Sequence, residues 1–225
     1  MKNYPYPLSI LFVLFLLFIG CAAHTSLHPA GEGNWQSTVS LGGPIVNVFD
    51  TYLPSPWPTI GATYGYKDNL DFEGGVHLLP FVYEMSGVDL GTTWYPRAGK
   101  KNDPSIALQA KVMTLASFKE GVDDRFRFVP VLTGAASWRH KKNTVYYTGM
   151  NVIIPTTRPD YDDNAAYFLA SPFAGYGWKL NERLKLFTEL KWQGANIKSD
   201  MLAVTYTGIF GYGALAPLVA IEWNF

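Results

Sequence analysis

Histidine near carboxylates is the pattern in this sequence that comes closest to acid–base chemistry. His77 lies four residues after Glu73, in a stretch whose side chains alternate between apolar and polar. In an extended strand that spacing puts the two Cα atoms about 13 Å apart, too far for direct proton transfer. Asp89, on the next alternating stretch, comes closer if the register of the two strands allows it. We therefore expect His77 to lie in a buried ion network and not in a catalytic site.

A run of acidic residues has the composition of a cation-binding loop. Asp160, Asp162 and Asp163 are followed by Asn164, and carboxylate and amide oxygens suit Ca²⁺ or Mg²⁺. The run lacks the Gly and the terminal Glu of an EF-hand loop. We favour a solvated acidic loop and expect no cofactor.

Residues 211–216 (GYGALA) match the G-x-G-x-x-A fingerprint of dinucleotide-binding folds. That fingerprint needs a strand before it and a helix after it. Here Pro217 follows and an alternating pattern continues to the C-terminus, so a nucleotide site is not predicted.

The elements that carry these candidate residues have the composition and the periodicity of β-strands. Aromatic residues make up 16% of the chain and Gly occurs 21 times, which suits strands joined by turns. The 18 basic and 18 acidic residues balance, so no nucleic-acid partner is expected. Alternation recurs from residue 34 onward without an amphipathic helix, and it predicts ten strands near 34–43, 58–66, 70–81, 87–96, 105–118, 126–139, 144–154, 166–179, 184–195 and 211–225.

Charged and apolar side chains separate onto opposite faces of these strands. The six clearest strands have an apolar face without charge, and a Lys or Arg facing lipid would cost about 2–4 kcal/mol. We expect the polar faces to line a narrow or plugged lumen laced with ion pairs. Besides His77, that lumen network comprises Asp71, Glu73, Asp89, Glu189 and Glu222 with Lys111, Arg127, Arg139, Lys185 and Lys191.

The connections between the predicted strands are alternately short and long. Residues 67–69 and 181–183 are short and polar, whereas 43–57, 155–165 and 196–208 are long; Arg97 to Pro104 is long for its place. This pattern is typical of an antiparallel up-and-down transmembrane β-barrel with tight turns on one side and long loops on the other. Three prolines fall inside predicted strands, where each is expected to need a bulge or a shifted boundary: Pro130, Pro172 and Pro217.

The N-terminus has the pattern of an export signal. Lys2 precedes an apolar run from 8 to 19, which is too short to span a membrane as a helix. The run ends in Gly20-Cys21, which resembles the lipobox of bacterial lipoproteins, whose cysteine is diacylated. The resemblance implies a signal peptide (1–20), a tether lipidated at Cys21 (21–33) and a barrel domain (34–225). The pattern departs from the lipobox at Phe18, where Leu is usual, and the alternative is signal peptidase I cleavage near Ala22 or Ala23.

The last strand ends on Phe225 and resembles the C-terminal strand of bacterial outer-membrane β-barrel proteins. The resemblance implies an outer-membrane location with both termini in the periplasm. It also implies contact with outer-membrane lipid and lipopolysaccharide, and recognition of the last strand by barrel-assembly machinery. We expect a structural, adhesive or narrow-channel role. The acidic loop at Asp160 to Asp163 would then share cations with lipopolysaccharide phosphates.

Two alternatives come from other barrel proteins. Gly33-Asn34-Trp35 resembles the G-x-W of lipocalins, which implies an eight-stranded carrier of an apolar ligand. A barrel enzyme acting on outer-membrane lipid, similar to lipid A deacylases or omptin-like proteases, would need a Ser or Asp within hydrogen-bond reach of His77 or another histidine near the rim. No motif of those enzymes matches this sequence residue by residue.

Overall fold

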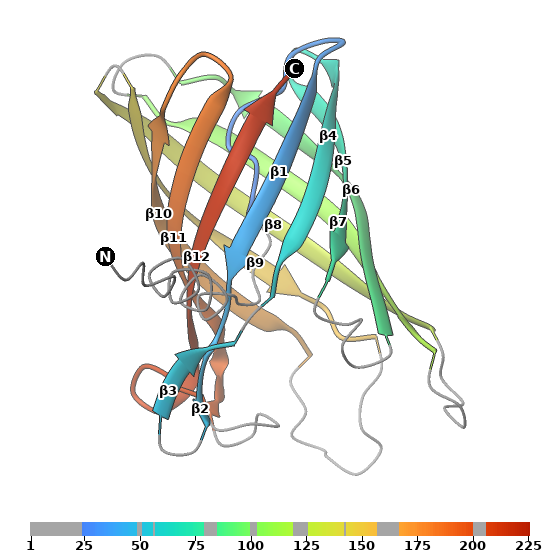
Figure 1. Ribbon diagram of the computed structural model, residues 1–225, viewed down its shortest axis with the longest axis vertical. Coiled ribbons are helices and arrows are strands. Elements are labelled where there is room, and N and C mark those ends of the chain that lie inside the picture. The colour runs from blue at the N-terminus through green and yellow to red at the C-terminus, as the bar shows by residue number, and fades with distance from the viewer. Residues whose placement is uncertain are drawn as a thin grey trace, which may run out of the picture.

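Ten strands close into an antiparallel barrel, which confirms the predicted fold (Figure 1). The computed structural model describes residues 24–48, 51–55, 57–78, 85–99, 103–118, 126–141, 143–156, 167–199 and 206–225. The barrel consists of β1 (Trp35–Gly42), β4 (Thr59–Lys67), β5 (Leu70–His77), β6 (Met85–Arg97), β7 (Ser105–Ser117), β8 (Phe126–Lys141), β9 (Thr144–Ile153), β10 (Leu169–Lys179), β11 (Leu184–Lys198) and β12 (Tyr212–Asn224).

Each barrel strand pairs with its neighbours in sequence, and β1 pairs with β12 to close the wall. The seam runs from Gln36 opposite Asn224 to Gly42 opposite Leu218. At its end the amide of Phe225 donates to the carbonyl of Trp35 over 3.0 Å. The C-terminal strand is therefore the closing strand of the cylinder.

A separate hairpin of β2 (Ile45–Val48) and β3 (Thr51–Pro54) interrupts the connection between β1 and β4. The sequence pattern predicts a loop in this region. Strands of four residues are too short to show a clear alternation, which is why the pattern does not reveal them.

No bulge lies at any of the three strand prolines, so that prediction is wrong, but each proline lies just beyond the end of the ladder to one of its two neighbouring strands. Pro130 is opposite Val112, Pro172 is opposite Met150, and Pro217 is opposite Leu190, without a register shift at any of these positions. Proline removes one donor but keeps its carbonyl. The carbonyl of Pro130 accepts from Ile154 over 2.9 Å. The ladders to the second neighbours begin or end at the adjacent residues, Val131, Phe173 and Leu218.

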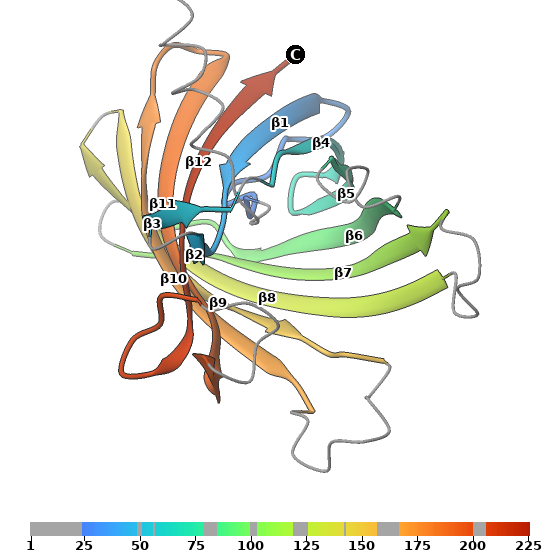
Figure 2. The same cartoon turned by 60° about the horizontal axis from the view of Figure 1, so that its bottom comes forward.

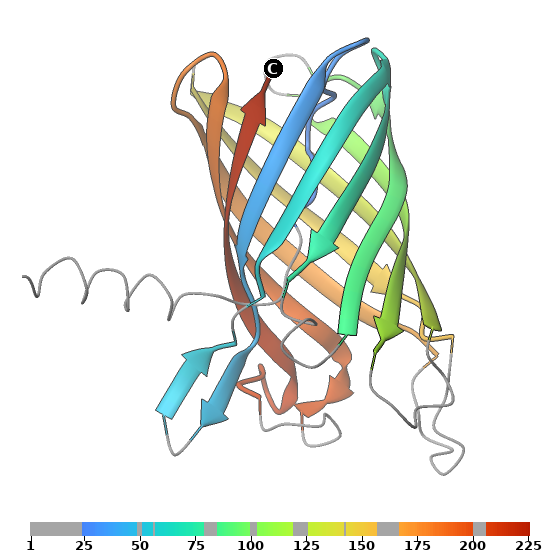
Figure 3. The same ribbon diagram turned by 45° about the vertical axis from the view of Figure 1, so that its right-hand side comes forward.

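The two ends of the barrel differ in their connections (Figure 3). The C-terminus lies at the end with the short connections after β4, β6, β8 and β10, which we call the turn end. The connection from β6 to β7 is longer, but Arg97 forms an ion pair with Asp103 at 3.1 Å and the amide of Gly99 donates to Ser105. The β2–β3 hairpin and the long connections lie at the opposite end, the loop end.

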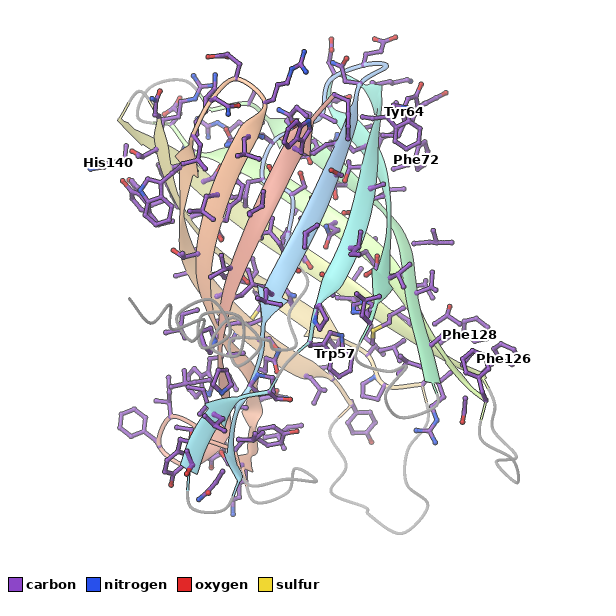
Figure 4. All side chains as sticks on the ribbon, in the orientation of Figure 1. Trp57, Tyr64, Phe72, Phe126, Phe128 and His140 are labelled. Atoms are coloured by element: carbon purple, nitrogen blue, oxygen red, sulfur yellow. The ribbon has the colours of Figure 1, made fainter. Side chains whose placement is uncertain are left out.

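The outer wall is apolar. Leu90 is 67% exposed, and Val39, Leu132 and Ile221 are also exposed on the outside. Aromatic side chains lie near both ends: Tyr64 and Phe72 near the turn end, and Phe126 and Phe128 near the loop end (Figure 4). Such a wall is more stable against an apolar medium than against water. The barrel has ten strands and a charged interior, so it does not fit the lipocalin alternative, which has eight strands and an apolar interior.

No helix within the described residues is long and apolar enough to cross a membrane.

The described N-terminal residues lie inside the barrel (Figure 2). We call residues 24–30 the internal segment. Its first four residues, from His24 to Leu27, are at most 6% exposed. The chain then reaches the turn end, where the amide of Gly33 donates to the carbonyl of Gly65 over 2.8 Å before β1 begins. The sequence predicts a tether here, and the structure places the described part of that tether in the lumen.

Candidate functional site inside the barrel

Three neighbouring strands bring together a cluster of charged side chains in the lumen. The ammonium of Lys111 on β7 is 3.2 Å from Glu73 on β5 and 4.0 Å from Asp89 on β6. Glu73 also accepts a 2.6 Å hydrogen bond from Thr93. Gly91 stands between Glu73 and Lys111 in the register and leaves room for them, since a Cβ there would be 2.5 Å from Cγ of Lys111.

His77 links this cluster to the loop end. Its Nε2 is 2.9 Å from Oδ2 of Asp89, and its Nδ1 accepts a 2.9 Å hydrogen bond from the indole of Trp57. The register of β5 and β6 thus brings Asp89 within hydrogen-bond reach of His77. Glu73, on the same strand as His77, is not within that reach. Both ring nitrogens are engaged, so neither is available to take a proton from a nucleophile. Asp89 thus meets the distance that the barrel-enzyme alternative requires, but the acceptor nitrogen of His77 is occupied by Trp57, as in a histidine with a structural role.

A second cluster lies where β11 and β12 face the internal segment. Lys185 on β11 donates to Glu222 on β12 over 3.1 Å, and Lys191 is 3.2 Å from Glu189. His24 contributes from the internal segment. Its Nε2 is 3.3 Å from Glu222 and its Nδ1 is 4.0 Å from Glu189. Both carboxylates are at most 4% exposed, so the cluster is held in a medium that screens charge weakly.

Asp71 attaches the internal segment to the wall near the turn end. Its Oδ2 accepts hydrogen bonds from the amide of Ala30 at 3.0 Å and from the hydroxyl of Tyr95 at 3.1 Å. The same tyrosine hydroxyl is 3.3 Å from Oγ of Ser26. Leu27 packs into the apolar core with Tyr147 and Phe187. The segment is thus fixed by polar contacts and by apolar burial.

A cavity of about 290 Å³ lies in the lumen beyond the internal segment. His24 and Thr25 lie at one side of it, and its wall carries amide and hydroxyl groups from Gln109, Asn151 and Ser171. The rest of the lining is mixed. The ionisable side chains of His77, Asp89, Lys111 and Lys191 lie beside apolar and aromatic ones: Trp57, Met113, Val131, Ile153, Leu169 and Tyr206. A volume of this order suits a small solute.

The remaining predicted site residues lie apart from these clusters. Arg127 and Arg139 lie near the two ends of β8, where both are exposed, and neither joins the ion pairs above. Cys21 and the acidic loop at Asp160, Asp162 and Asp163 lie outside the described residues.

Residues 211–216 lie at the start of β12 and not at a strand-to-helix turn. Gly213 has φ of 59°, and a Cβ there would be 2.7 Å from the indole nitrogen of Trp192. These glycines therefore allow the backbone to enter β12 close to the ring of Trp192.

Three contributors to the site are not predicted from the sequence. Trp57 lies in a connection, and His24 and Ser26 lie in a segment without periodicity. Only the burial of that segment in the barrel brings His24 and Ser26 to the charged clusters. In the sequence, the one signal for these residues is a Trp in a connection directly before a predicted strand.

Comparisons with known proteins give distant structural likenesses. The NanC porin aligns with a TM-score of 0.47 and 8% identity over 85% of this chain and 100% of that chain. The translocator domain of the autotransporter NalP from Neisseria meningitidis gives a TM-score of 0.41 and 10% identity, over 87% and 89% of the two chains. The outer-membrane channel DcaP of Acinetobacter baumannii gives 0.35 and 13%, over 92% and 69%.

No protein-family model matches the sequence, and no curated protein matches it. The class that the fold itself defines is a closed antiparallel β-barrel of ten strands with an apolar outside and a charged inside.

Proposed function

We propose that this protein is an outer-membrane barrel that acts as a narrow, gated conduit, closed in its resting state by the internal segment. The observation that carries the proposal is the division of the lumen. A cavity of about 290 Å³ lies on one side of His24, and the buried, hydrogen-bonded segment lies on the other. A solute that enters the cavity would pass only when the segment moves.

The membrane location is supported by the outer wall. Exposed apolar side chains such as Leu90 and Ile221 lie between rings of aromatic residues, as lipid-facing surfaces require. The short turns and the C-terminus would face the periplasm, and the cavity would open outward.

The closed state is supported by the contacts of the segment. Ala30 and Ser26 are joined to Asp71 and Tyr95, and His24 lies between two carboxylates. Each hydrogen bond to the Asp71 carboxylate contributes about 1.5–3 kcal/mol net, so the segment is held in the resting state and opening requires these contacts to be replaced by water or by new partners. The segment has the properties of a displaceable plug.

Conductance across planar bilayers tests the proposal. The full chain should give little steady current, and a variant lacking residues 24–30 should give a steady and larger current. A control variant, Tyr52→Ala on the exposed face of β3, should leave the current low. Equal currents from the full chain and the plug deletion would reject the gated conduit in favour of a structural role.

Location has its own test. Folded protein in outer-membrane fractions should run faster in gels before heating than after it, and its strands should resist protease. Release of an intact, water-soluble protein by salt or alkali would reject the membrane-spanning arrangement.

A further inference from the structure

We propose that the luminal cavity is a binding site for a small, neutral molecule that has an apolar ring body and one hydroxyl head group. This assignment rests on the proposed function, because such a molecule is the solute that the conduit would admit, although binding itself requires no passage. Three features of the wall carry it: the order of side chains across neighbouring strands, a buried acceptor that faces the cavity, and the pairing of the charges.

Uncharged polar side chains form a row across five neighbouring strands of the lumen wall. The register places Gln109 on β7 opposite both Thr93 on β6 and Thr133 on β8. Asn151 on β9 is opposite both Thr133 and Ser171 on β10. We call these five residues the polar row. Its members Gln109, Asn151 and Ser171 line the cavity and offer hydrogen-bonding groups without charge.

An apolar row lies beside the polar row, two residues nearer the loop end. Val131 on β8 is opposite Ile153 on β9, and Ile153 is opposite Leu169 on β10. All three side chains line the cavity. Two residues along a strand span about 7 Å, so the two rows are adjacent layers of the same wall. The wall of β8 to β10 thus presents an apolar surface next to a hydrogen-bonding one.

One acceptor of the polar row faces the cavity without a partner of its own. Oδ1 of Asn151 is buried and accepts no hydrogen bond from the described residues. Its neighbours in the row are engaged, since Nε2 of Gln109 donates to a hydroxyl of the row over 3.3 Å and Oγ of Ser171 accepts from a backbone amide over 3.1 Å. Buried polar atoms usually have a partner, and an amide oxygen can only accept. Asn151 therefore suits a solute that donates a hydrogen bond.

The lysines and the aspartate that line the cavity are paired within the wall. Lys111 is 3.2 Å from Glu73 and 4.0 Å from Asp89, and Lys191 is 3.2 Å from Glu189. A charged solute would have to compete with these pairs in a site that screens charge weakly. A neutral solute leaves the pairs intact, and for this reason we assign a neutral ligand.

The volume and the aromatic lining of the cavity indicate the size and shape of the ligand. A dry apolar cavity of about 150 Å³ holds one benzene molecule. The volume of about 290 Å³ therefore has room for two fused rings. Trp57 and Tyr206 also line the cavity, and aromatic side chains pack favourably against planar rings. 2-Naphthol combines these properties and is the probe for the test.

Equilibrium dialysis of labelled 2-naphthol against the full chain in lipid vesicles measures binding, with uptake by protein-free vesicles subtracted. At about pH 7 a phenolic hydroxyl keeps its proton. We expect a single saturable site. Naphthalene lacks the donor and 2-naphthoate carries a charge, so each should displace the probe only at about tenfold higher free concentration, as for the loss of one hydrogen bond. No saturable binding, or equal displacement by all three compounds, would overturn the assignment.

Matched variants test whether the site is the lumen cavity. Val131→Phe fills part of the cavity, and Asn151→Leu removes the acceptor. Their outward-facing neighbours supply the controls Leu132→Phe and Met150→Leu, at positions that are 49% and 43% exposed. Heat-dependent gel migration verifies folding, and either folded lumen variant is sufficient for the test. Binding should weaken about tenfold or more in the lumen variants and stay unchanged in the controls. Unchanged binding in a folded lumen variant would overturn the assignment.

Binding and conductance separate this proposal from the conduit. Saturable binding by the full chain, with no larger current after deletion of residues 24–30, would uphold the site and reject the gated conduit. A larger current after that deletion, without saturable binding of 2-naphthol, would reject the site alone.

Discussion

Trp57 donates its indole N–H to Nδ1 of His77 over 2.9 Å, and this contact settles where the proton of a neutral His77 lies. An indole nitrogen only donates, so Nδ1 must accept. The ring proton is then on Nε2, 2.9 Å from Asp89. One hydrogen-bonded chain therefore runs from the connection before β4 through β5 to β6.

Replacing Trp57 by Phe should loosen that connection while the barrel persists. The change removes one hydrogen bond, which contributes about 0.5–1.5 kcal/mol. We expect faster cleavage by protease near residues 55–58 in detergent-folded protein, with unchanged heat-dependent gel migration. Tyr52→Phe on the exposed hairpin is the control and should behave like the unaltered protein. If both variants are cleaved at the same rate as the unaltered protein, Trp57 does not hold the connection.

Removing Glu222 should cost more than removing both members of its ion pair. Glu222 is 2% exposed and accepts from Lys185 over 3.1 Å. Loss of one partner of a fully buried pair costs about 3–5 kcal/mol, and the cost should be smaller here because the Lys185 side chain is 21% exposed; replacement of both partners by apolar residues is often nearly neutral. Urea unfolding in lipid vesicles should give E222L as the least stable variant, with K185M/E222L partly restored. Additive losses in the double variant would show that the two residues act separately.

Leu90→Arg should weaken insertion because Leu90 faces outward in the middle of β6. The side chain is 67% exposed, and Arg near the midplane of a bilayer costs about 2–4 kcal/mol. Leu180→Arg is a matched control at the turn end, where Leu180 is 55% exposed and the expected cost is about 0–1 kcal/mol. Unfolding free energies in vesicles measure both. Similar costs at the two positions would argue against a membrane around the wall.

Gly175→Ala should destabilise the barrel through overpacking. Gly175 lies opposite Tyr147, and a Cβ there would overlap the tyrosine ring and hydroxyl. Extra volume in a packed interior costs about 1–3 kcal/mol. Gly134→Ala is the matched control, because the nearest atom to its Cβ would be 3.7 Å away on Leu108. The thermal midpoint should fall for the first variant only, and a fall of equal size in both would reject the packing argument.

The strands follow from the sequence because a two-sided wall imposes a strict alternation. Asp71 and Phe72 on β5, or Lys185 and Leu186 on β11, occupy opposite environments, and the period of two records that difference. Strand ends agree with the prediction to within a few residues. The short β2 and β3 leave no such record.

The contacts inside the barrel can be predicted from the sequence only in part. Alternation indicates that Lys111 and Glu73 share a face, but their pairing at 3.2 Å depends on the register through Gly91. Arg139 shows the limit of the rule, because a position on the polar face near a strand end is exposed. His24 and Trp57 enter the site from segments without periodicity, and only the closed three-dimensional wall brings them there.

The seam between β1 and β12 sets an order of events during assembly. A continuous ladder encircles the internal segment, and a chain cannot cross such a ladder once it is formed. The segment must occupy the half-made cylinder before Gln36 meets Asn224, or be threaded afterwards through one of its mouths. In the first case the strands close around residues 24–30. A chain that lacks these residues should still pair its strands, but its barrel should close more slowly.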